Sequence, residues 1–279
     1  MWGRVPALQA DCFGHTGGMS ALVSIAVPIH NTARFLPAAL DSLLAQDHRH
    51  WEALLWDDGS TDGSGDIVAD YAARDPRFRV LGNGRNNGVG IAVASALAEA
   101  GGEYLCVLDS DDQLEPEALS AMLAFMREHP QLGMAYSEYV EVDEDGVFLT
   151  DGKRFLKPYS SHQLLVDFMT YQFRLLRSDA YRAIGGFDTA MGISPDYDLC
   201  LRMSEHYPIA HLAKPLYRYR MRRDSISHGS RLRQVRASFD AAQRALQRRG
   251  QQAQYALSLG VRARHVLRPK HAARQGDDA

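Results

Sequence analysis

Strand-like and helix-like segments alternate along the first 112 residues, and each apolar strand ends in a short polar turn. Apolar and β-branched runs at 22–27, 52–56, 78–81 and 104–108 predict four buried strands, with helical segments between them. Strands that alternate with helices form parallel sheets joined by right-handed crossovers. The sequence therefore predicts an α/β fold with a mostly parallel sheet and helices on both of its faces.

Polar residues follow all four predicted strands, at 28–31, 57–60, 85–87 and 109–112. In open parallel sheets, ligands bind in the crevice beyond the carboxyl ends of the strands. Four polar turns that converge on one sheet edge are harder to explain as solvated loops than any one turn alone. We therefore expect these turns to line a single binding crevice.

The fourth turn carries three carboxylates, Asp109, Asp111 and Asp112, directly after a buried strand. Carboxylates are almost never buried without partners, so we expect them at the open end of that strand. Asp109 and Asp111 project alike if the chain stays extended, and oxygen ligands of this kind suit Mg2+ or Mn2+. The alternative is a solvated acidic turn in which Asp112 caps the helix after Pro116.

The composition of the chain indicates which broad class of protein it belongs to. The chain has 279 residues, of which 46% are hydrophobic and 9% aromatic, as in a globular protein with an ample core. Its formal net charge of -3 does not favour a nucleic-acid partner. Cys12, Cys106 and Cys200 are widely spaced, which indicates neither a disulfide framework nor a zinc site and fits a reducing compartment. No apolar run approaches the length of a bilayer-spanning helix.

The second half of the chain is less regular. Residues 133–142 alternate loosely, and Asp145-Gly146 predicts the turn of a hairpin. A helix is expected from about Ser161. A further helix is expected with Ser194 as its N-cap and Pro195 as its first residue.

Taken together, these motifs resemble the family 2 glycosyltransferases, which have the GT-A fold. The resemblance covers about residues 21–227. It rests on VPIHN at 27–31, DDGSTD at 57–62, NNG at 86–88, LDSDD at 108–112, GGFD at 185–188, PDYDLCLRM at 195–203 and YRYRMRRDSIS at 217–227. It implies a GT-A fold with a Rossmann-like, mostly parallel sheet, followed by a C-terminal helical extension.

The resemblance assigns donor-binding roles to residues of the first three turns. Pro28 and Asn31 would shape the wall around the nucleotide base. Asp58 would accept a hydrogen bond from the uracil imide, while Asp57 supports its own turn. Asn87 is expected among the donor-binding residues.

The resemblance also implies the chemistry of the reaction. Asp109 would bind the ribose or donor sugar, and Asp111, with Asp109, would hold a divalent cation, Mg2+ or Mn2+, that neutralises the leaving diphosphate. Asp196 matches the catalytic base, which takes the proton of an acceptor hydroxyl during a single inverting displacement. Asp198 is expected to stay outside the chemistry, as another acid in the first turn of a helix.

Three positions depart from the family pattern. Pro195 stands where a glutamate often precedes the base, Val93 where an arginine often follows an alanine, and Arg222 where a histidine often contacts the metal or the diphosphate. An arginine cannot ligate a cation, but it can pair with a phosphate. Arg220 and Arg222 are therefore predicted to bind the donor diphosphate.

The predicted organisation is a disordered leader (1–18), a nucleotide-sugar-binding half (19–112), an acceptor-binding and catalytic half (113–230) and a basic helical extension (231–279). The implied function is a metal-dependent inverting glycosyltransferase of the hexosyltransferase type. Its donor would be a nucleotide-diphosphate sugar, expected to be a UDP-sugar. Its acceptor would be a glycan, a lipid-linked molecule or another hydroxyl compound in surface polysaccharide or glycoconjugate synthesis.

Two alternatives to this function stay open. One is a catalytically degenerate protein that binds nucleotide sugar or glycan as an assembly partner. The other is a nucleotidyltransferase, which would want a Gly- and Lys/Arg-rich phosphate loop after the first strand, and residues 28–32 offer none.

The basic extension also has two interpretations. It is either a solvated helical face packed on the catalytic domain or a surface that lies against anionic lipids. The protein is expected in the cytoplasm, with peripheral contact to the inner face of the membrane in the second case.

Overall fold

The computed structural model describes residues 21–191, 194–222 and 231–260. The predicted leader and the end of the basic extension lie outside these ranges. Within them, nine strands form one sheet in the order β3-β2-β1-β4-β8-β6-β9-β5, with β7 paired to β6. The strands are β1 (Val23–Ile29), β2 (Trp51–Asp57), β3 (Phe78–Gly82), β4 (Tyr104–Val107), β5 (Gln113–Leu114), β6 (Met134–Val142), β7 (Phe148–Asp151), β8 (Arg174–Arg177) and β9 (Ile209–Arg220).

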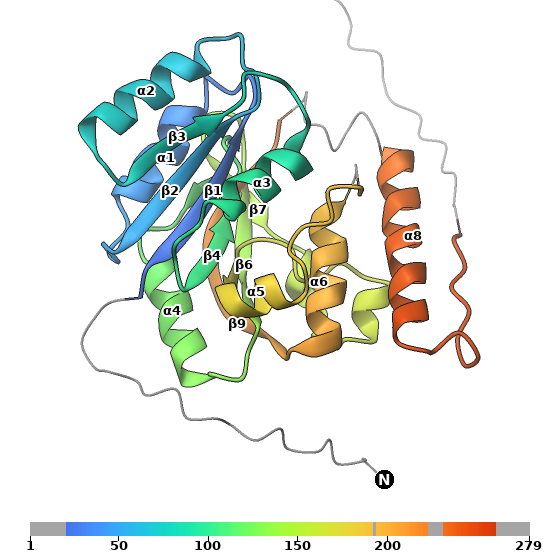
Figure 1. Ribbon diagram of the computed structural model, residues 1–279. Helices are drawn as coiled ribbons and strands as arrows, with labels where there is room; N and C mark the ends of the chain where they lie inside the picture. Colours follow the sequence, from blue (N-terminus) through green and yellow to red (C-terminus); the bar gives the residue numbers. More distant parts are fainter. Residues whose placement is uncertain (1–20, 192–193, 223–230, 261–279) are drawn as a thin grey trace, which may run out of the picture.

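The four strands predicted in the first half are confirmed, and they pair in parallel. β1 is central, with Val23 opposite Trp51 of β2 on one side and Tyr104 of β4 on the other. Every residue of β1 is buried, which explains its continuous apolar run. Parallel pairing brings the carboxyl ends of β1, β2, β3 and β4 to one edge of the sheet (Figure 1).

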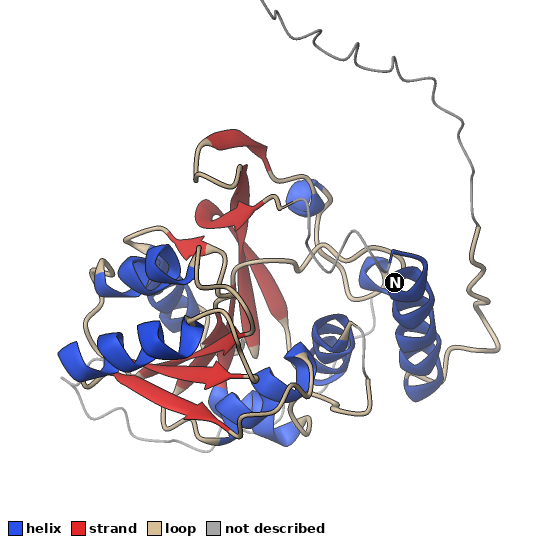
Figure 2. Ribbon diagram, turned by 90° about the horizontal axis from the view of Figure 1, so that it is seen from above, coloured by secondary structure: helices blue, strands red, loops and turns tan. Residues whose placement is uncertain are grey.

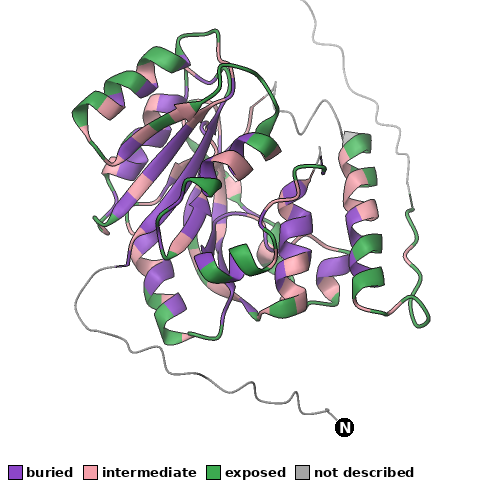
Figure 3. Ribbon diagram, in the orientation of Figure 1, coloured by how far each residue is buried: buried purple, intermediate pink, exposed green. Residues whose placement is uncertain are grey.

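Helices cover both faces of the sheet, as predicted, and each face has its own apolar core (Figures 1 and 3). Alternate residues of β1 contribute to different cores. Ile25 and Val27 belong to the first core, and Ala26 belongs to the second. The first core contains side chains of α1 (Leu36–Leu44), α2 (Ser64–Arg74) and α4 (Ala118–Glu128). The second contains side chains of α3 (Val89–Ala98), α5 (Ser178–Ala183), α6 (Pro195–His206) and α8 (Arg231–Arg248).

The second half of the chain extends the sheet with mixed pairing (Figure 2). β8 is antiparallel to both β4 and β6, whereas β9 runs parallel to β6 and antiparallel to β5. The predicted hairpin around Asp145-Gly146 is confirmed as the β6–β7 connection. The prediction of a helix from about Ser161 is wrong. This irregular region has only short 3-10 turns in the described structure, one before Ser161 at Arg154–Leu156 and one after it at Gln163–Leu165.

The described part of the basic extension begins with the helix α8, which stands beside α6 (Figure 2), and continues as irregular chain to residue 260. Its buried side chains are Ala241, Ala242, Ala245 and Leu246. On the same side, Arg248 pairs with Glu205 of α6 at 2.8 Å. Over this stretch the helix packs on the body of the protein, as the first interpretation of the extension expects. None of the helices in the described ranges combines the length and apolar character needed to cross a bilayer.

Candidate active site

The polar turns at the carboxyl ends of the first four strands are connected by hydrogen bonds. The side chain of Asn31 accepts a hydrogen bond from the backbone N–H of Thr61 at 2.8 Å, which connects the first turn to the second. Thr32 donates to Ser110 at 3.0 Å, which connects the first turn to the fourth. The expected convergence of these turns is therefore present in the structure, at the edge where β1, β2 and β4 end.

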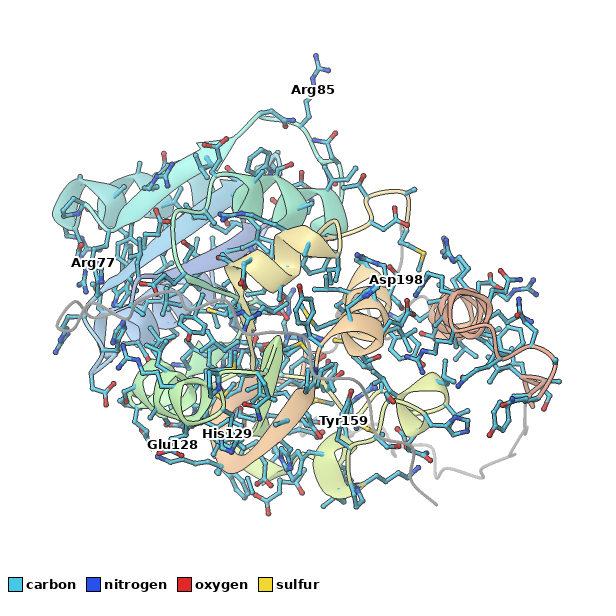
Figure 4. The ribbon with its side chains drawn as sticks, turned by 60° about the horizontal axis from the view of Figure 1, so that its bottom comes forward. Arg77, Arg85, Glu128, His129, Tyr159 and Asp198 are labelled. Carbon is cyan, nitrogen blue, oxygen red and sulfur yellow. The ribbon has the colours of Figure 1, made fainter. Side chains whose placement is uncertain are left out.

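Asp58 fastens the second turn to the third. Its buried carboxylate accepts hydrogen bonds from the backbone N–H groups of Asn87 and Gly88, at 2.9 and 2.8 Å. A carboxylate has about four acceptor positions, so these two bonds leave capacity for a ligand donor. Its neighbour Asp57 accepts a hydrogen bond from Ser60 N–H at 2.9 Å, which confirms its predicted role in the turn. Arg85, in the same loop as Asn87, points away from the body of the molecule (Figure 4).

Asp112 is not a helix cap. It is buried, and its carboxylate accepts hydrogen bonds from Tyr217 Oη at 2.8 Å and from the backbone N–H of Arg220 at 2.7 Å. Helix α4 begins later, at Ala118, without a side-chain cap. The prediction that Asp112 caps this helix is therefore wrong, because Asp112 instead ties the fourth turn to β9.

Asp109 lies among other charged groups of the site. Its carboxylate accepts a hydrogen bond from Gln172 Nε2 at 3.1 Å. Burial, together with the nearby carboxylates of Asp111 and Asp196, raises the pKa of Asp109 from its ordinary 3.8 to about 7, while Arg174 acts in the opposite direction. Two carboxylates that are far apart in the sequence, Asp109 and Asp196, therefore influence each other in the folded protein.

The raised pKa of Asp109 predicts a pH dependence of stability in the absence of divalent cations. Between about pH 4 and pH 7 the folded protein holds a proton at Asp109 that the unfolded chain releases, so the free energy of unfolding falls as the pH rises through this window. Asp109→Asn removes this contribution. Urea unfolding in EDTA should show that the variant gains stability relative to the wild type between about pH 5 and pH 8.

Asp145→Asn is the control for this prediction, because the Asp145 side chain is 82% exposed in the β6–β7 turn. The difference in unfolding free energy between Asp145→Asn and the wild type should be the same at about pH 5 and at about pH 8. A similar pH-independent difference for Asp109→Asn would contradict the prediction.

Asp196 lies in the first turn of α6, and its side chain is 32% exposed. The buried guanidinium of Arg174 in β8 contacts one oxygen of its carboxylate, at 3.4 Å from Nη1 and 3.5 Å from Nη2. The same guanidinium donates to the carbonyl of Thr170 at 3.2 Å. Arg174 thus holds the carboxylate of Asp196 from the protein side while part of that side chain stays accessible.

The predicted start of α6 is confirmed, because Ser194 lies at the N-cap position and Pro195 is the first residue of the helix. Ser194 adopts a left-handed conformation, with φ of 58°, and makes no capping hydrogen bond. Its hydroxyl instead accepts a hydrogen bond from Ser238 of α8 at 3.4 Å.

Asp198 takes part in ion pairs on the other side of α6. It is buried and pairs with Arg202 at 2.7 Å and with Arg248 of α8 at 3.8 Å. A carboxylate with two guanidinium partners stabilises the packing of α6 and α8. This agrees with the prediction that Asp198 stays outside the chemistry.

Arg174 and Gln172 are site residues that the sequence reasoning missed. The sequence signal for Arg174 was present, because an arginine between the apolar Phe173 and Leu175 requires a buried partner. The pattern could not name Asp196 as that partner.

The guanidinium of Arg220 is used within the chain. It donates to the carbonyl of Asp111 at 2.6 Å and to the carbonyls of Asp143 and Glu144 at 3.1 and 2.9 Å. These bonds fasten the β6–β7 turn to the acidic turn. They favour a structural role for Arg220 over its predicted contact with the donor.

Arg222 lies at the mouth of the site. Its Nη1 is 2.9 Å from Oδ2 of Asp111. Beside it lies a cleft of about 270 Å³, lined by Asn31, Thr32, Arg34, Phe35, Asp62, Glu144 and Arg222. Arg34, on the rim of the cleft, pairs with Glu144 at 2.7 Å and so joins the region before α1 to the β6–β7 turn.

Asp111 and Asp109 supply the oxygen donors that a divalent cation prefers. No three acidic, histidine or cysteine side chains in the described ranges are grouped to hold a metal by themselves. Mg2+ in phosphate-transfer sites needs only one or two carboxylates, with waters and substrate phosphates completing the shell. The two carboxylates fit such a cation, provided that Arg222 leaves the oxygen of Asp111 that it now contacts.

Comparisons with known proteins agree with this geometry. The family model of glycosyl transferase family 2 matches residues 24–194. The chain is 32% identical over 196 residues to a chondroitin synthase of Escherichia coli, a match that covers 70% of this chain and 28% of the synthase. This chain therefore spans less than a third of that relative.

Solved structures share the fold. Staphylococcus aureus TarS in complex with UDP-GlcNAc is similar with a TM-score of 0.64 at 22% identity, over 77% of this chain and 64% of TarS. The mannosyltransferase PcManGT of Pyrobaculum calidifontis, in complex with GDP-Man and Mn2+, is similar with a TM-score of 0.61 at 17% identity, over 84% of this chain and 76% of that one. The predicted GT-A fold is confirmed. With its strands, its acidic turn and the family model in agreement, this chain belongs to glycosyl transferase family 2.

Proposed function

We propose that this protein is an inverting glycosyltransferase that transfers a sugar from a UDP-sugar to an acceptor hydroxyl in the synthesis of a bacterial surface polysaccharide. The observation that carries the proposal is that one short segment holds both carboxylates. Gln172 donates to Asp109 at 3.1 Å, and Arg174, two residues later, contacts Asp196, which comes from the acceptor half of the chain, at 3.4 Å. A base next to the donor-binding carboxylates is the arrangement that a direct displacement requires.

In the proposed reaction, Asp196 accepts the proton of the acceptor hydroxyl as that oxygen attacks the anomeric carbon. Arg174 keeps the carboxylate oriented through its contact with Oδ2. The diphosphate leaves from the opposite face, so the anomeric configuration inverts. A bound Mg2+ or Mn2+ supplies charge neutralisation for the leaving diphosphate, and Asp111 and Asp109 would hold it.

The choice of a UDP-sugar is supported by two independent features. Asp58 retains acceptor positions after its two backbone bonds, which suits the N–H of a uracil imide. TarS, which shares the fold, is known in complex with UDP and with UDP-GlcNAc. The chondroitin synthase relative supports a polysaccharide acceptor.

The proposal is tested by calorimetric titration with UDP, GDP and dTDP in the presence of Mn2+, followed by incubation with a panel of UDP-sugars. We expect UDP to bind more tightly than the other two nucleotides. We also expect one UDP-sugar to yield product whose anomeric configuration, read by NMR, is opposite to that of the donor. Tighter binding of GDP or dTDP would refute the UDP assignment. Binding of UDP without transfer to any acceptor would favour the assembly-partner alternative.

A further inference from the structure

A cationic side chain of the protein already contacts the carboxylate assigned to the divalent cation. Nη1 of Arg222 lies 2.9 Å from Oδ2 of Asp111, and the two side chains are only 14% and 25% exposed. The guanidinium also lies over the ring of Phe35, 4.8 Å from its centroid. An ion pair that is largely removed from water and covered by an aromatic ring is stronger than a surface pair.

Neighbouring residues hold Asp111 in place. Its backbone carbonyl accepts the 2.6 Å hydrogen bond from Nε of Arg220, and its neighbour Asp112 is buried and bonded to β9. Arg222 lies two residues beyond the end of β9, at the wall of the 270 Å³ cleft. The cleft therefore offers space into which the Arg222 side chain can move when it leaves Asp111.

The charges decide when this exchange is favourable. A divalent cation that takes Oδ2 of Asp111 without a diphosphate replaces the guanidinium there and lies beside its positive charge in a largely buried site, which is costly. A diphosphate offers the guanidinium a new anionic partner, and guanidinium groups match phosphate oxygens well. The cost of cation binding then falls, because both positive charges gain an anion.

We propose that Arg222 excludes the divalent cation from Asp111 in the free protein, so that the cation and the donor diphosphate bind cooperatively. Arg222 moves from Asp111 to the diphosphate as the cation takes its place. The inference rests on the proposed function, because it takes the donor diphosphate as the new partner of Arg222. By linkage, the cation must raise the affinity for UDP by the same factor by which UDP raises the affinity for the cation.

The test is a titration with Mn2+, in which free Mn2+ is measured by electron paramagnetic resonance, for the wild type and Arg222→Gln with and without UDP. Without UDP, we expect Arg222→Gln to bind Mn2+ about tenfold or more tightly than the wild type, within the usual range of coupling between sites. UDP should strengthen Mn2+ binding to the wild type by a similar factor and to the variant by much less. Circular dichroism melting should establish that both proteins are folded.

Two further variants test whether the change in Mn2+ binding depends on the contact between Arg222 and Asp111. Arg34→Gln removes another guanidinium from the same cleft, one that pairs with Glu144 and Asp145, and it should leave Mn2+ binding as in the wild type. Asp111→Asn combined with Arg222→Gln should abolish the Mn2+ binding that the single Arg222 variant gains.

Equal Mn2+ affinity of the wild type and Arg222→Gln without UDP would overturn the inference. Gained binding that survives Asp111→Asn would do the same. Failure of the wild type to bind UDP at all would instead contradict the proposed function. The comparison of Mn2+ binding without UDP would still decide whether Arg222 excludes the cation.

Discussion

Asp196→Asn is expected to reduce the rate of sugar transfer by about 10²- to 10⁴-fold, the usual contribution of a general base. The asparagine amide has the same size and still offers an oxygen to Arg174, but it cannot accept the proton of the acceptor hydroxyl. UDP binding should be retained, because the hydrogen-bond donor to Asp196 in the described ranges is Arg174, which is not among the predicted donor-binding residues. The measurement is the single-turnover rate with a UDP-sugar, beside calorimetry with UDP.

Asp179→Asn is a matched control for this prediction. Asp179 is also an acid in the first turn of a helix, α5, but its side chain is 71% exposed and pairs with Arg177. It should transfer sugar at the wild-type rate. A wild-type rate in Asp196→Asn would remove the proposed base and leave the inverting mechanism without support.

The largest effect on stability is expected from Asp112→Ala. The substitution leaves the hydroxyl of Tyr217 and the backbone N–H of Arg220 buried without their acceptor. Each such loss costs about 1–3 kcal/mol, and the relief of burying a carboxyl offsets part of it, so we expect the free energy of unfolding to fall by about 2–4 kcal/mol. Urea unfolding followed by circular dichroism measures the change.

Tyr217→Phe separates the two hydrogen bonds of Asp112, because it removes the hydroxyl donor and leaves the bond from Arg220 intact. It also removes the acceptor of a long hydrogen bond, 3.3 Å, from the backbone N–H of Asp109. Its cost should be about 1 kcal/mol, clearly below that of Asp112→Ala. Asp151→Ala, on the exposed edge strand β7, should change stability by no more than about 0.5 kcal/mol. An unfolding midpoint of Asp112→Ala close to that of Asp151→Ala would show that the buried network contributes little.

Local features of the chain were predictable from sequence. The four strands of the first half lie within two residues of the expected positions. Buried parallel strands are recognisable in a sequence because they are short apolar runs bounded by turn residues. The hairpin at Asp145-Gly146 was equally predictable, because Asp-Gly is a dipeptide that favours the tight turns of β-hairpins. These predictions depend only on residues that are adjacent in the sequence, so they can be made without knowledge of the fold.

Features that depend on distant partners were not predictable. Asp112 resembles a helix cap until Tyr217 and Arg220, more than a hundred residues later, are known to take its carboxylate. Ser194 occupies the predicted N-cap position, but its backbone is left-handed and its hydroxyl bonds to α8 instead of capping the helix. The contact between Arg174 and Asp196 depends on how β8 meets α6. In each case the partner is set by tertiary packing, which overrides the local preference of the residue.

The position of β9 has a consequence for the biosynthesis of the protein. β9 is the last strand of the described chain to leave the ribosome, yet it lies inside the sheet, between β6 and β5, and pairs with β6 from Met134 to Val142. Until Ile209–Arg220 has been made, the edge of β6 exposes unpaired peptide groups, which promote association between chains. Nascent or truncated polypeptides that end before Ile209 are therefore expected to aggregate and to depend on chaperones. A shortened version made for crystallography must include the whole of β9.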